Sequence, residues 1–176
     1  SKQTADYVVI SVWAYDVDKN WIWVDGIVER QLMNKTIDQL FDFALEYQPQ
    51  GVGVEISGQQ QGFIAWIMNE MNYREQYFNL THQKGNPGIR PATDKLARFN
   101  MVVPQFKAGK IFFPEELRKT KKMQTAMEQI ALATIDGIKG KDDFIDTVSM
   151  LQYMNPWVPN GIRPVEEKTT GPTGTQ

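Results

Sequence analysis

The chain has 176 residues, of which 41% are hydrophobic and 23% charged, and this composition is typical of one soluble domain with a substantial apolar core. It contains no cysteine and a single histidine, which excludes disulfides, thiolate metal sites and histidine-rich zinc sites. No apolar run is long enough to cross a membrane and no signal peptide opens the sequence, so we expect a cytosolic protein.

The charged residues are distributed unevenly along the sequence, although the net charge is only -2. Residues 1–50 carry a net charge of -4, whereas residues 90–122 carry +6. An acidic first part followed by a basic middle is consistent with metal-binding carboxylates beside a track for a polyanion. The commoner alternative is that these charges lie on solvated helix faces.

A β-hairpin is predicted at the start of the chain. Residues 7–15 and 21–29 are rich in β-branched and aromatic residues, and the polar stretch 16–20 between them has the length of a hairpin turn. An amphipathic helix is predicted next, over residues 37–46, with Thr36 as its N-cap.

Residues 51–58 are the stretch around which we expect the rest of the domain to be organised. Their sequence, Gly-Val-Gly-Val-Glu-Ile-Ser-Gly, predicts a short buried strand between helix 37–46 and a second helix over residues 60–71. A strand between two helices is normally the middle of a mixed or parallel sheet and is covered on both faces. Glu55 is the exception in this apolar strand, because a glutamate is rarely buried without a partner or a metal. It is therefore either a paired carboxylate or a residue of a functional site.

The second half of the chain is predicted to alternate between short strands, loops and helices. We expect a strand at 77–80, a loop at 81–93, a helix at 95–106 that contains Pro104, a strand at 110–114 and a long helix at 115–135. A last helix is predicted to begin at Asp142 or Asp143. We assign residues 1–154 to one domain and expect residues 155–176, which are rich in proline, glycine and threonine, to form a disordered tail or a linker.

Three acidic residues are the best candidates for a chemical site: Glu55 on the predicted central strand, and the pair Asp142 and Asp143 at a helix start. Magnesium and manganese prefer oxygen ligands, and two such ions about 4 Å apart can activate a water and stabilise the leaving oxygen of a phosphodiester. This chemistry requires neither histidine nor cysteine, in agreement with the composition. The simpler alternative is that Asp142 or Asp143 only caps its helix.

Two motifs carry a resemblance to a known family: Val54-Glu55-Ile56-Ser57-Gly58 and Lys141-Asp142-Asp143-x-x-Asp146. Two weaker matches are Asp6-Tyr7 at a strand start and Asp94-Lys95-x-x-Arg98 at a helix start. With these motifs, the chain from about residue 5 to about residue 154 resembles the nuclease domain of a tailed-bacteriophage terminase large subunit. The resemblance implies an RNase H-like α/β fold, with a mixed sheet flanked by helices. It also implies a metal-dependent endonuclease that cuts concatemeric viral DNA during packaging.

The resemblance further implies roles for individual residues. Glu55 and Asp143 would be ligands of Mg²⁺ or Mn²⁺, with two ions in the site, and Asp142 would be either an additional ligand or a group that supports the ligands from behind. Contacts to the backbone of double-stranded DNA would come from Lys84, Arg90, Lys95 and Arg98. The implied partners are an upstream ATPase motor, the portal and the small terminase subunit, and the implied location is the cytoplasm of the infected bacterial host.

One feature of the family has no counterpart in this sequence. The family's nuclease domain begins with a strand that carries the first catalytic aspartate, whereas this sequence resembles the family from the loop after that strand. We therefore expect the first strand to be missing, with weaker metal binding and cleavage as the consequence. Two other functions stay open: another RNase H-like enzyme, such as a junction resolvase, and a non-catalytic module that docks DNA or a portal protein.

Overall fold

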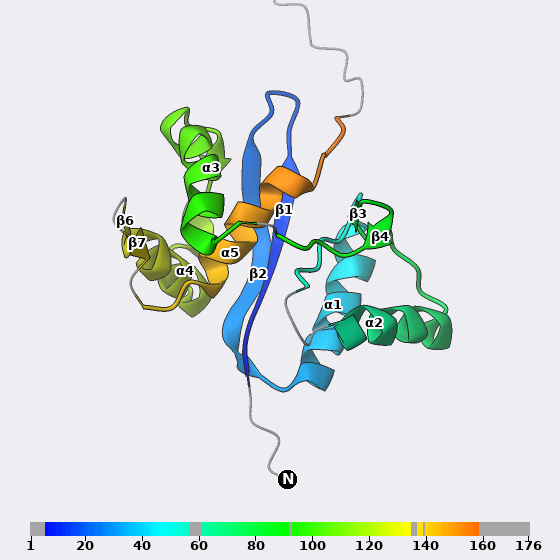
Figure 1. The fold of residues 1–176 in the computed structure, drawn as a ribbon. Helices are drawn as coiled ribbons and strands as arrows, with labels where there is room; N and C mark the ends of the chain where they lie inside the picture. The colour runs from blue at the N-terminus through cyan, green and yellow to red at the C-terminus, as the bar shows by residue number, and fades with distance from the viewer. Residues whose placement is uncertain (1–5, 57–60, 92, 135–136, 139, 159–176) are drawn as a thin grey trace, which may run out of the picture.

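The fold is a mixed α/β arrangement built on a long β-hairpin (Figure 1). The computed structural model describes residues 6–56, 61–91, 93–134, 137–138 and 140–158. Strand β1 (Asp6–Tyr15) pairs antiparallel with β2 (Trp21–Gln31), and β2 pairs parallel with the short strand β5 (Ile111–Phe112), so the sheet order is β1-β2-β5. The predicted hairpin is confirmed, and so is a short strand within residues 110–114.

Local chemistry explains the hairpin. In its turn, the Asp16 carboxylate accepts hydrogen bonds from the backbone N–H groups of Asp18 and Asn20, at 2.9 and 2.8 Å. The pairing shifts register after Val12, which marks a β-bulge. Glycine is required at position 26, because a Cβ there would lie 2.4 Å from the carbonyl oxygen of Ile10.

A first buried cluster, which we call the first core, lies between the hairpin and three helices. These helices are α3 (Lys95–Lys107), α4 (Lys121–Ala131) and α5 (Asp143–Met150). The buried members of the first core are Trp21, Trp23, Val28, Val102, Met123, Ala126, Phe144, Val148 and Leu151. Helix α5 lies across the hairpin and contacts β1, α3 and α4 (Figure 1).

A second buried cluster, the second core, lies on the other side of the hairpin, where Figure 1 shows α1 (Met33–Tyr47) and α2 (Gln61–Arg74). Its buried members are Ile37, Phe41, Ile56, Ile64, Ile67, Met71 and Leu80. No buried residue belongs to both clusters among the residues that the structure describes. The domain therefore buries its apolar side chains in two places rather than one.

The stretch 51–56 is extended, but it is not a strand of the β1-β2-β5 sheet, so the prediction of a central strand there is wrong. It makes isolated parallel bridges instead, from Val52 to Leu80 and from Glu55 to Ile89. The apolar pattern identified an extended segment correctly, but local sequence does not specify which chain lies beside it. The rest of the predicted strand, residues 57–60, lies outside the described residues.

Two helix predictions need correction. Helix α1 begins at Met33 with Leu32 as N-cap, and the Thr36 hydroxyl lies inside the helix and donates to the Leu32 carbonyl at 3.2 Å. The predicted helix 115–135 is divided into a 3-10 turn, η2 (Glu115–Leu117), and α4. The division occurs at Thr120, whose hydroxyl accepts from the Met123 N–H at 3.3 Å and so caps α4.

The remaining segments are mostly as expected. Asp94 caps α3, which continues through Pro104, and α2 and α5 fall where helices were predicted. The predicted loop 81–93 contains the small strands β3 (His82–Gln83) and β4 (Asn86–Pro87), and the predicted strand at 77–80 is reduced to one bridge. The other small elements are β6 (Ala133–Thr134), β7 (Gly137–Ile138) and the 3-10 turn η3 (Leu151–Tyr153).

Two further sequence predictions concern membrane-spanning segments and the C-terminal tail. Within the described ranges, no helix combines the length and the apolar character needed to traverse a bilayer. Most of the predicted tail, residues 159–176, lies outside the described residues. Just before it, Trp157 exchanges two hydrogen bonds with the Gln50 side chain, at 2.8 and 3.1 Å.

Candidate functional site

Glu55 and the start of helix α5 come together around the side chain of Arg98. The Arg98 Nη2 atom lies 2.9 Å from Asp146 Oδ1 and 3.6 Å from Glu55 Oε1. Its Nη1 atom donates to the carbonyl of Thr93 at 2.8 Å. Arg98 belongs to α3 and is 5% exposed, so this guanidinium forms a buried link between three separate parts of the chain.

Lys95 lies one helical turn before Arg98 and binds the same acidic surface of α5. Its Nζ atom is 2.9 Å from Asp142 Oδ1 and 2.8 Å from Asp146 Oδ2. Burial lowers the pKa of Lys95, but the hydrogen bonds to Asp146 and Asp142 outweigh that effect and raise the pKa above its ordinary value. Lys95 is thus held as a cation between two carboxylates.

Asp142 and Asp143 lie at the start of α5, where a simple capping role was the alternative to a functional one. Asp142 occupies the N-cap position, but its side chain makes no capping hydrogen bond and accepts from Lys95 instead. The pKa of Asp143 is raised, first by burial and then by the negative charge of Asp142. The helix start therefore concentrates two acidic side chains, of which Asp142 binds Lys95 rather than a capping N–H group.

The same negative charges affect the pKa of Glu55. Its pKa is raised, first by burial and then by the charge of Asp146, and the nearby cations of Arg98 and Lys95 compensate only in part. Four carboxylates therefore face two cations in this cluster: Glu55, Asp142, Asp143 and Asp146 against Lys95 and Arg98. The excess of negative charge favours the binding of a further cation.

Asp146 is a member of the site to which we assigned no role from the sequence. Its side chain is 13% exposed and accepts from both Lys95 and Arg98. The signal that identifies it is its spacing, because residues three and four positions apart share one face of a helix, and Asp146 follows Asp143 and Asp142 at these intervals.

The oxygen donors of this cluster suit magnesium or manganese chemically. Their present geometry does not, since no group of three or more Asp, Glu, His or Cys side chains among the described residues is placed to hold a metal ion. Lys95 and Arg98 lie between the carboxylates and pair with Glu55, Asp142 and Asp146. A divalent ion bound by Asp142 would have to displace Lys95.

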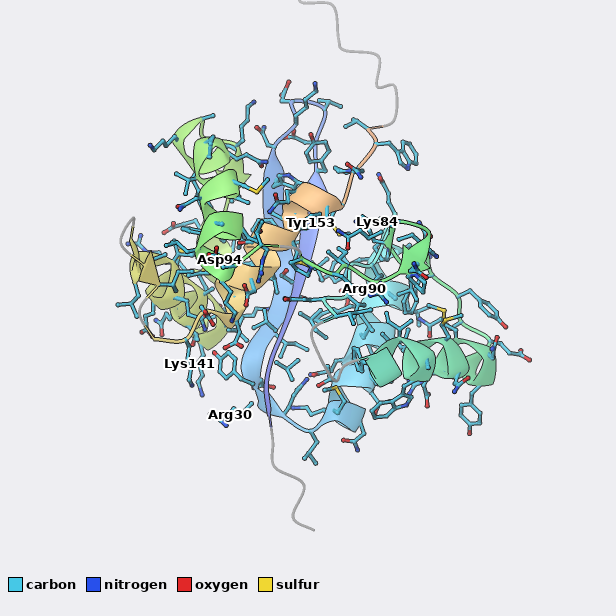
Figure 2. The ribbon with its side chains drawn as sticks, viewed as in Figure 1. Arg30, Lys84, Arg90, Asp94, Lys141 and Tyr153 are labelled. Atoms are coloured by element: carbon cyan, nitrogen blue, oxygen red, sulfur yellow. The ribbon has the colours of Figure 1, made fainter. Side chains whose placement is uncertain are left out.

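The predicted DNA contacts fall into two groups. Lys84 and Arg90 are exposed and lie on the same side of the molecule, beside β3 and β4 (Figure 2). Lys84 is in the turn between these strands, with a φ of 51°. Lys95 is about half exposed, whereas Arg98 is buried, so a phosphate contact by Arg98 would require its bonds to Asp146 and Thr93 to open.

Comparison with known proteins adds no further information about this site. No protein-family model, no curated protein and no solved structure matches the chain. The function is therefore argued from the carboxylate cluster and its surroundings.

Proposed function

We propose that this chain is a metal-dependent DNA endonuclease domain of the viral terminase type, with an RNase H-like fold, that cuts concatemeric double-stranded DNA. The observation that carries the proposal is the meeting of Glu55 with the acidic start of α5, two segments that lie far apart in the sequence. Acidic side chains that converge from different elements are what two-metal phosphodiester hydrolysis requires. The resemblance of the motifs around both segments supports the same function.

In this proposal Glu55, Asp143 and Asp142 hold Mg²⁺ or Mn²⁺, and Asp146 positions Lys95 and Arg98 behind them. The bound ions would activate the attacking water and stabilise the leaving oxygen. Lys95 would have to leave Asp142 for an ion to bind there, and its ammonium group would then be available to a DNA phosphate.

Lys84 and Arg90 would contact the DNA backbone from the β3–β4 side. Backbone contacts position DNA without reading its sequence, so we expect cleavage with little sequence preference. The partners in this proposal are the ATPase motor, the portal and the small terminase subunit. The proposed location is the cytoplasm of the infected bacterial host.

A second candidate function is a non-catalytic module that docks DNA or a portal protein. The bonds of Lys95 and Arg98 favour it, because they pair Glu55, Asp142 and Asp146 with cations without any metal. A junction resolvase, the third candidate, would share the carboxylate chemistry but would cut only branched DNA.

The deciding experiment is plasmid nicking with Mn²⁺, in which the chain is compared with its Glu55→Ala and Asp143→Ala variants. Glu116→Ala, at an exposed glutamate outside the cluster, is the matched control. We expect nicking by the chain and by the control, and none by the two site variants. Nicking that survives both site changes, or no nicking by the folded chain, would reject the proposal, and cleavage of branched DNA alone would favour the resolvase.

Metal binding can be tested separately from cleavage. We expect Lys95→Met to raise the affinity for Mn²⁺ in calorimetry, since it removes the cation that competes with the metal for Asp142. Lys107→Met, an exposed change on the same helix, should leave the affinity unchanged. A docking module would show no uptake of Mn²⁺ by any of these proteins.

A further inference from the structure

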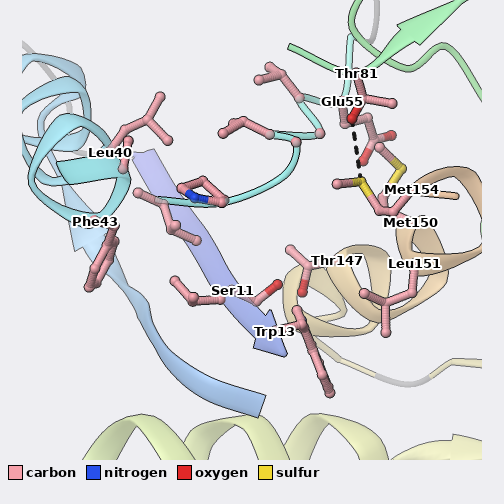
Figure 3. Close-up of a pocket in the computed structure, with 18 of the residues that line it drawn as sticks. Ser11, Trp13, Leu40, Phe43, Glu55, Thr81, Thr147, Met150, Leu151 and Met154 are labelled. Atoms are coloured by element: carbon pink, nitrogen blue, oxygen red, sulfur yellow. Dashed lines mark hydrogen bonds between the residues drawn. The ribbon is translucent and has the colours of Figure 1, made fainter. Parts of the chain in front are cut away.

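A slot of about 970 Å³ separates β1 from the extended stretch 51–55 (Figure 3). Residues 7–15 of β1 line one long side, and residues 51–55 line the other. Side chains of α1 and α5 close the slot above and below the plane of the sheet. The slot therefore lies where a neighbouring strand of β1 would lie.

The stretch 51–55 directs half of its peptide groups into this slot. Its recorded backbone hydrogen bonds, at 2.8–2.9 Å, join Val52, Val54 and Ile56 to Asn79, Thr81 and Ile89. In an extended chain, neighbouring residues direct their N–H and C=O groups to opposite sides. The peptide groups of Gly51, Gly53 and Glu55 consequently face the slot, and none of the recorded backbone bonds within the described residues involves them.

Strand β1 directs a second row of peptide groups into the slot. In the sheet order β1-β2-β5, β1 is an edge strand, and its recorded pairing is with β2 alone in the part of the chain that the structure describes. Every second residue of β1 therefore points its N–H and C=O away from β2. An open edge of this length is a template for pairing with another chain.

Most side chains on the two faces of the slot are apolar, although Asp143 and Asp146 of the acidic cluster also line it. Leu40 and Phe43 of α1 lie on one side of β1, and Met150 and Leu151 lie on the other (Figure 3). A strand with apolar side chains on both of its faces would bury them against both layers, as strands in the interior of α/β sheets do. Two facing hydrogen-bonding edges distinguish this slot from an ordinary apolar pocket, which needs only a few polar groups.

We infer that the slot accepts one extended, apolar polypeptide strand, which pairs with β1 on one side and with residues 51–55 on the other. The occupant is a peptide segment of about five to seven residues, since the shorter wall has five residues and a strand advances about 3.3 Å per residue. Its binding is a case of strand addition, in which main-chain hydrogen bonds supply affinity. Glu55, Asp143 and Asp146 line both this slot and the proposed metal site, but the inference rests on the two backbone edges and is tested without DNA or metal.

The probe is a synthetic nine-residue peptide with five central valine and isoleucine residues, two lysines at each end and blocked termini. Its control is the same peptide with N-methyl groups on alternate central residues, which keeps the apolar surface and removes the donors of one edge. Hydrogen exchange of the chain, followed by NMR, reports where each peptide binds. We expect the first peptide to protect the amides of Gly53, Glu55 and alternate residues of β1, and the methylated peptide to bind at least tenfold more weakly.

Two variants of the chain locate the site. Leu40→Trp places a larger side chain in the slot and should weaken peptide binding at least tenfold. Leu45→Trp, in the same helix at a position that is 65% exposed, should not. The inference is overturned if both peptides bind equally, if neither binds, or if the protected amides lie at β5. Protection of the slot that grows with protein concentration in the absence of peptide would also overturn it, because the occupant would then be a second copy of the chain.

Discussion

The two long sides of β1 are built in different ways. On one side, a continuous ladder pairs β1 with β2 from Asp6 opposite Gln31 to Tyr15 opposite Trp21. On the other side, the stretch 51–56 is held by isolated bridges at Val52 and Glu55, and it faces β1 across the slot. The first core therefore packs against a fully paired hairpin. The second core is held by side-chain packing of α1 and α2 and by a few backbone bridges.

An apolar pattern alone is not sufficient to place a segment in a sheet. Both regions have apolar extended segments, but only the hairpin has a partner that the chain itself delivers through a short turn. Segments that lack such a partner keep their shape through the side chains they bury. We expect the two regions to differ in their resistance to unfolding.

The largest effect is expected from Phe144→Ala in the first core. Phe144 is 0% exposed and packs edge-on against Trp23, with ring centroids 5.1 Å apart. The truncation should lower the free energy of unfolding by about 3–5 kcal/mol, measured by urea denaturation. Phe112→Ala, at a side chain that is 47% exposed, should cost much less, and equal losses would contradict the assignment of the first core.

Arg98→Met tests the link between the two regions, because Arg98 joins α5 to Glu55. The side chains of Arg98 and Asp146 are 6% and 13% exposed, so the change leaves a buried carboxylate that has lost one of its partners. We expect a loss of about 3 kcal/mol in the free energy of unfolding, measured by urea denaturation.

The double variant Arg98→Met with Asp146→Leu should recover most of this stability, since a buried ion pair can be replaced by apolar groups at little cost. Arg118→Met, which removes an exposed pair with Glu115, should leave the urea midpoint unchanged. A single Arg98 variant as stable as the parent chain would show that this ion pair does not connect the regions.

Ile67→Ala in the second core should act locally. Ile67 is 0% exposed in α2, and its truncation should cost about 2–5 kcal/mol. Native-state hydrogen exchange should show the loss in the amides of α2 and of Leu80 and Ile89, with the β1–β2 ladder unaffected. A uniform loss across both regions would mean that the two cores unfold as one unit.

The smallest effects concern pH, and they have opposite signs in the two regions. Burial raises the pKa of Asp25 on β2, but hydrogen bonds from Lys122, Gly26 and Tyr47 outweigh burial and lower it below its ordinary value. Asp25 therefore stabilises the fold above its ordinary pKa, and this contribution is lost as the pH falls through the lowered value. Asp25→Asn should destabilise the chain at neutral pH and have little effect in acid.

Glu55 should behave in the opposite way, because burial and the charge of Asp146 raise its pKa above the ordinary value of 4.5. Its favourable contribution is complete below that value and is lost as the pH rises through the raised pKa. Glu55→Gln should therefore stabilise the chain at neutral pH and lose this advantage in acid. Urea midpoints measured across the acidic pH range test both variants. If the midpoints of the Asp25 and Glu55 variants changed with pH in the same way, the opposite signs predicted for the two residues would be wrong.

Elements whose signals are local could be predicted from the sequence. The β-branched and aromatic runs with a polar turn specified the hairpin, and the helix predicted at 95–106 corresponds to α3. The acidic start of α5 was also visible, because helix starts favour such residues. Each of these features depends on residues within a few positions of one another.

The contacts between distant groups could not be predicted from the sequence. Asp142 and Asp146 bind Lys95 and Arg98, which lie 47 and 48 residues away along the chain in the two hydrogen bonds that join them. The stretch 51–56 was recognised as extended, but its neighbours at Leu80 and Ile89 were not. The physical reason is that periodicity and propensity report the shape of a segment, whereas its partner depends on how all the elements pack together.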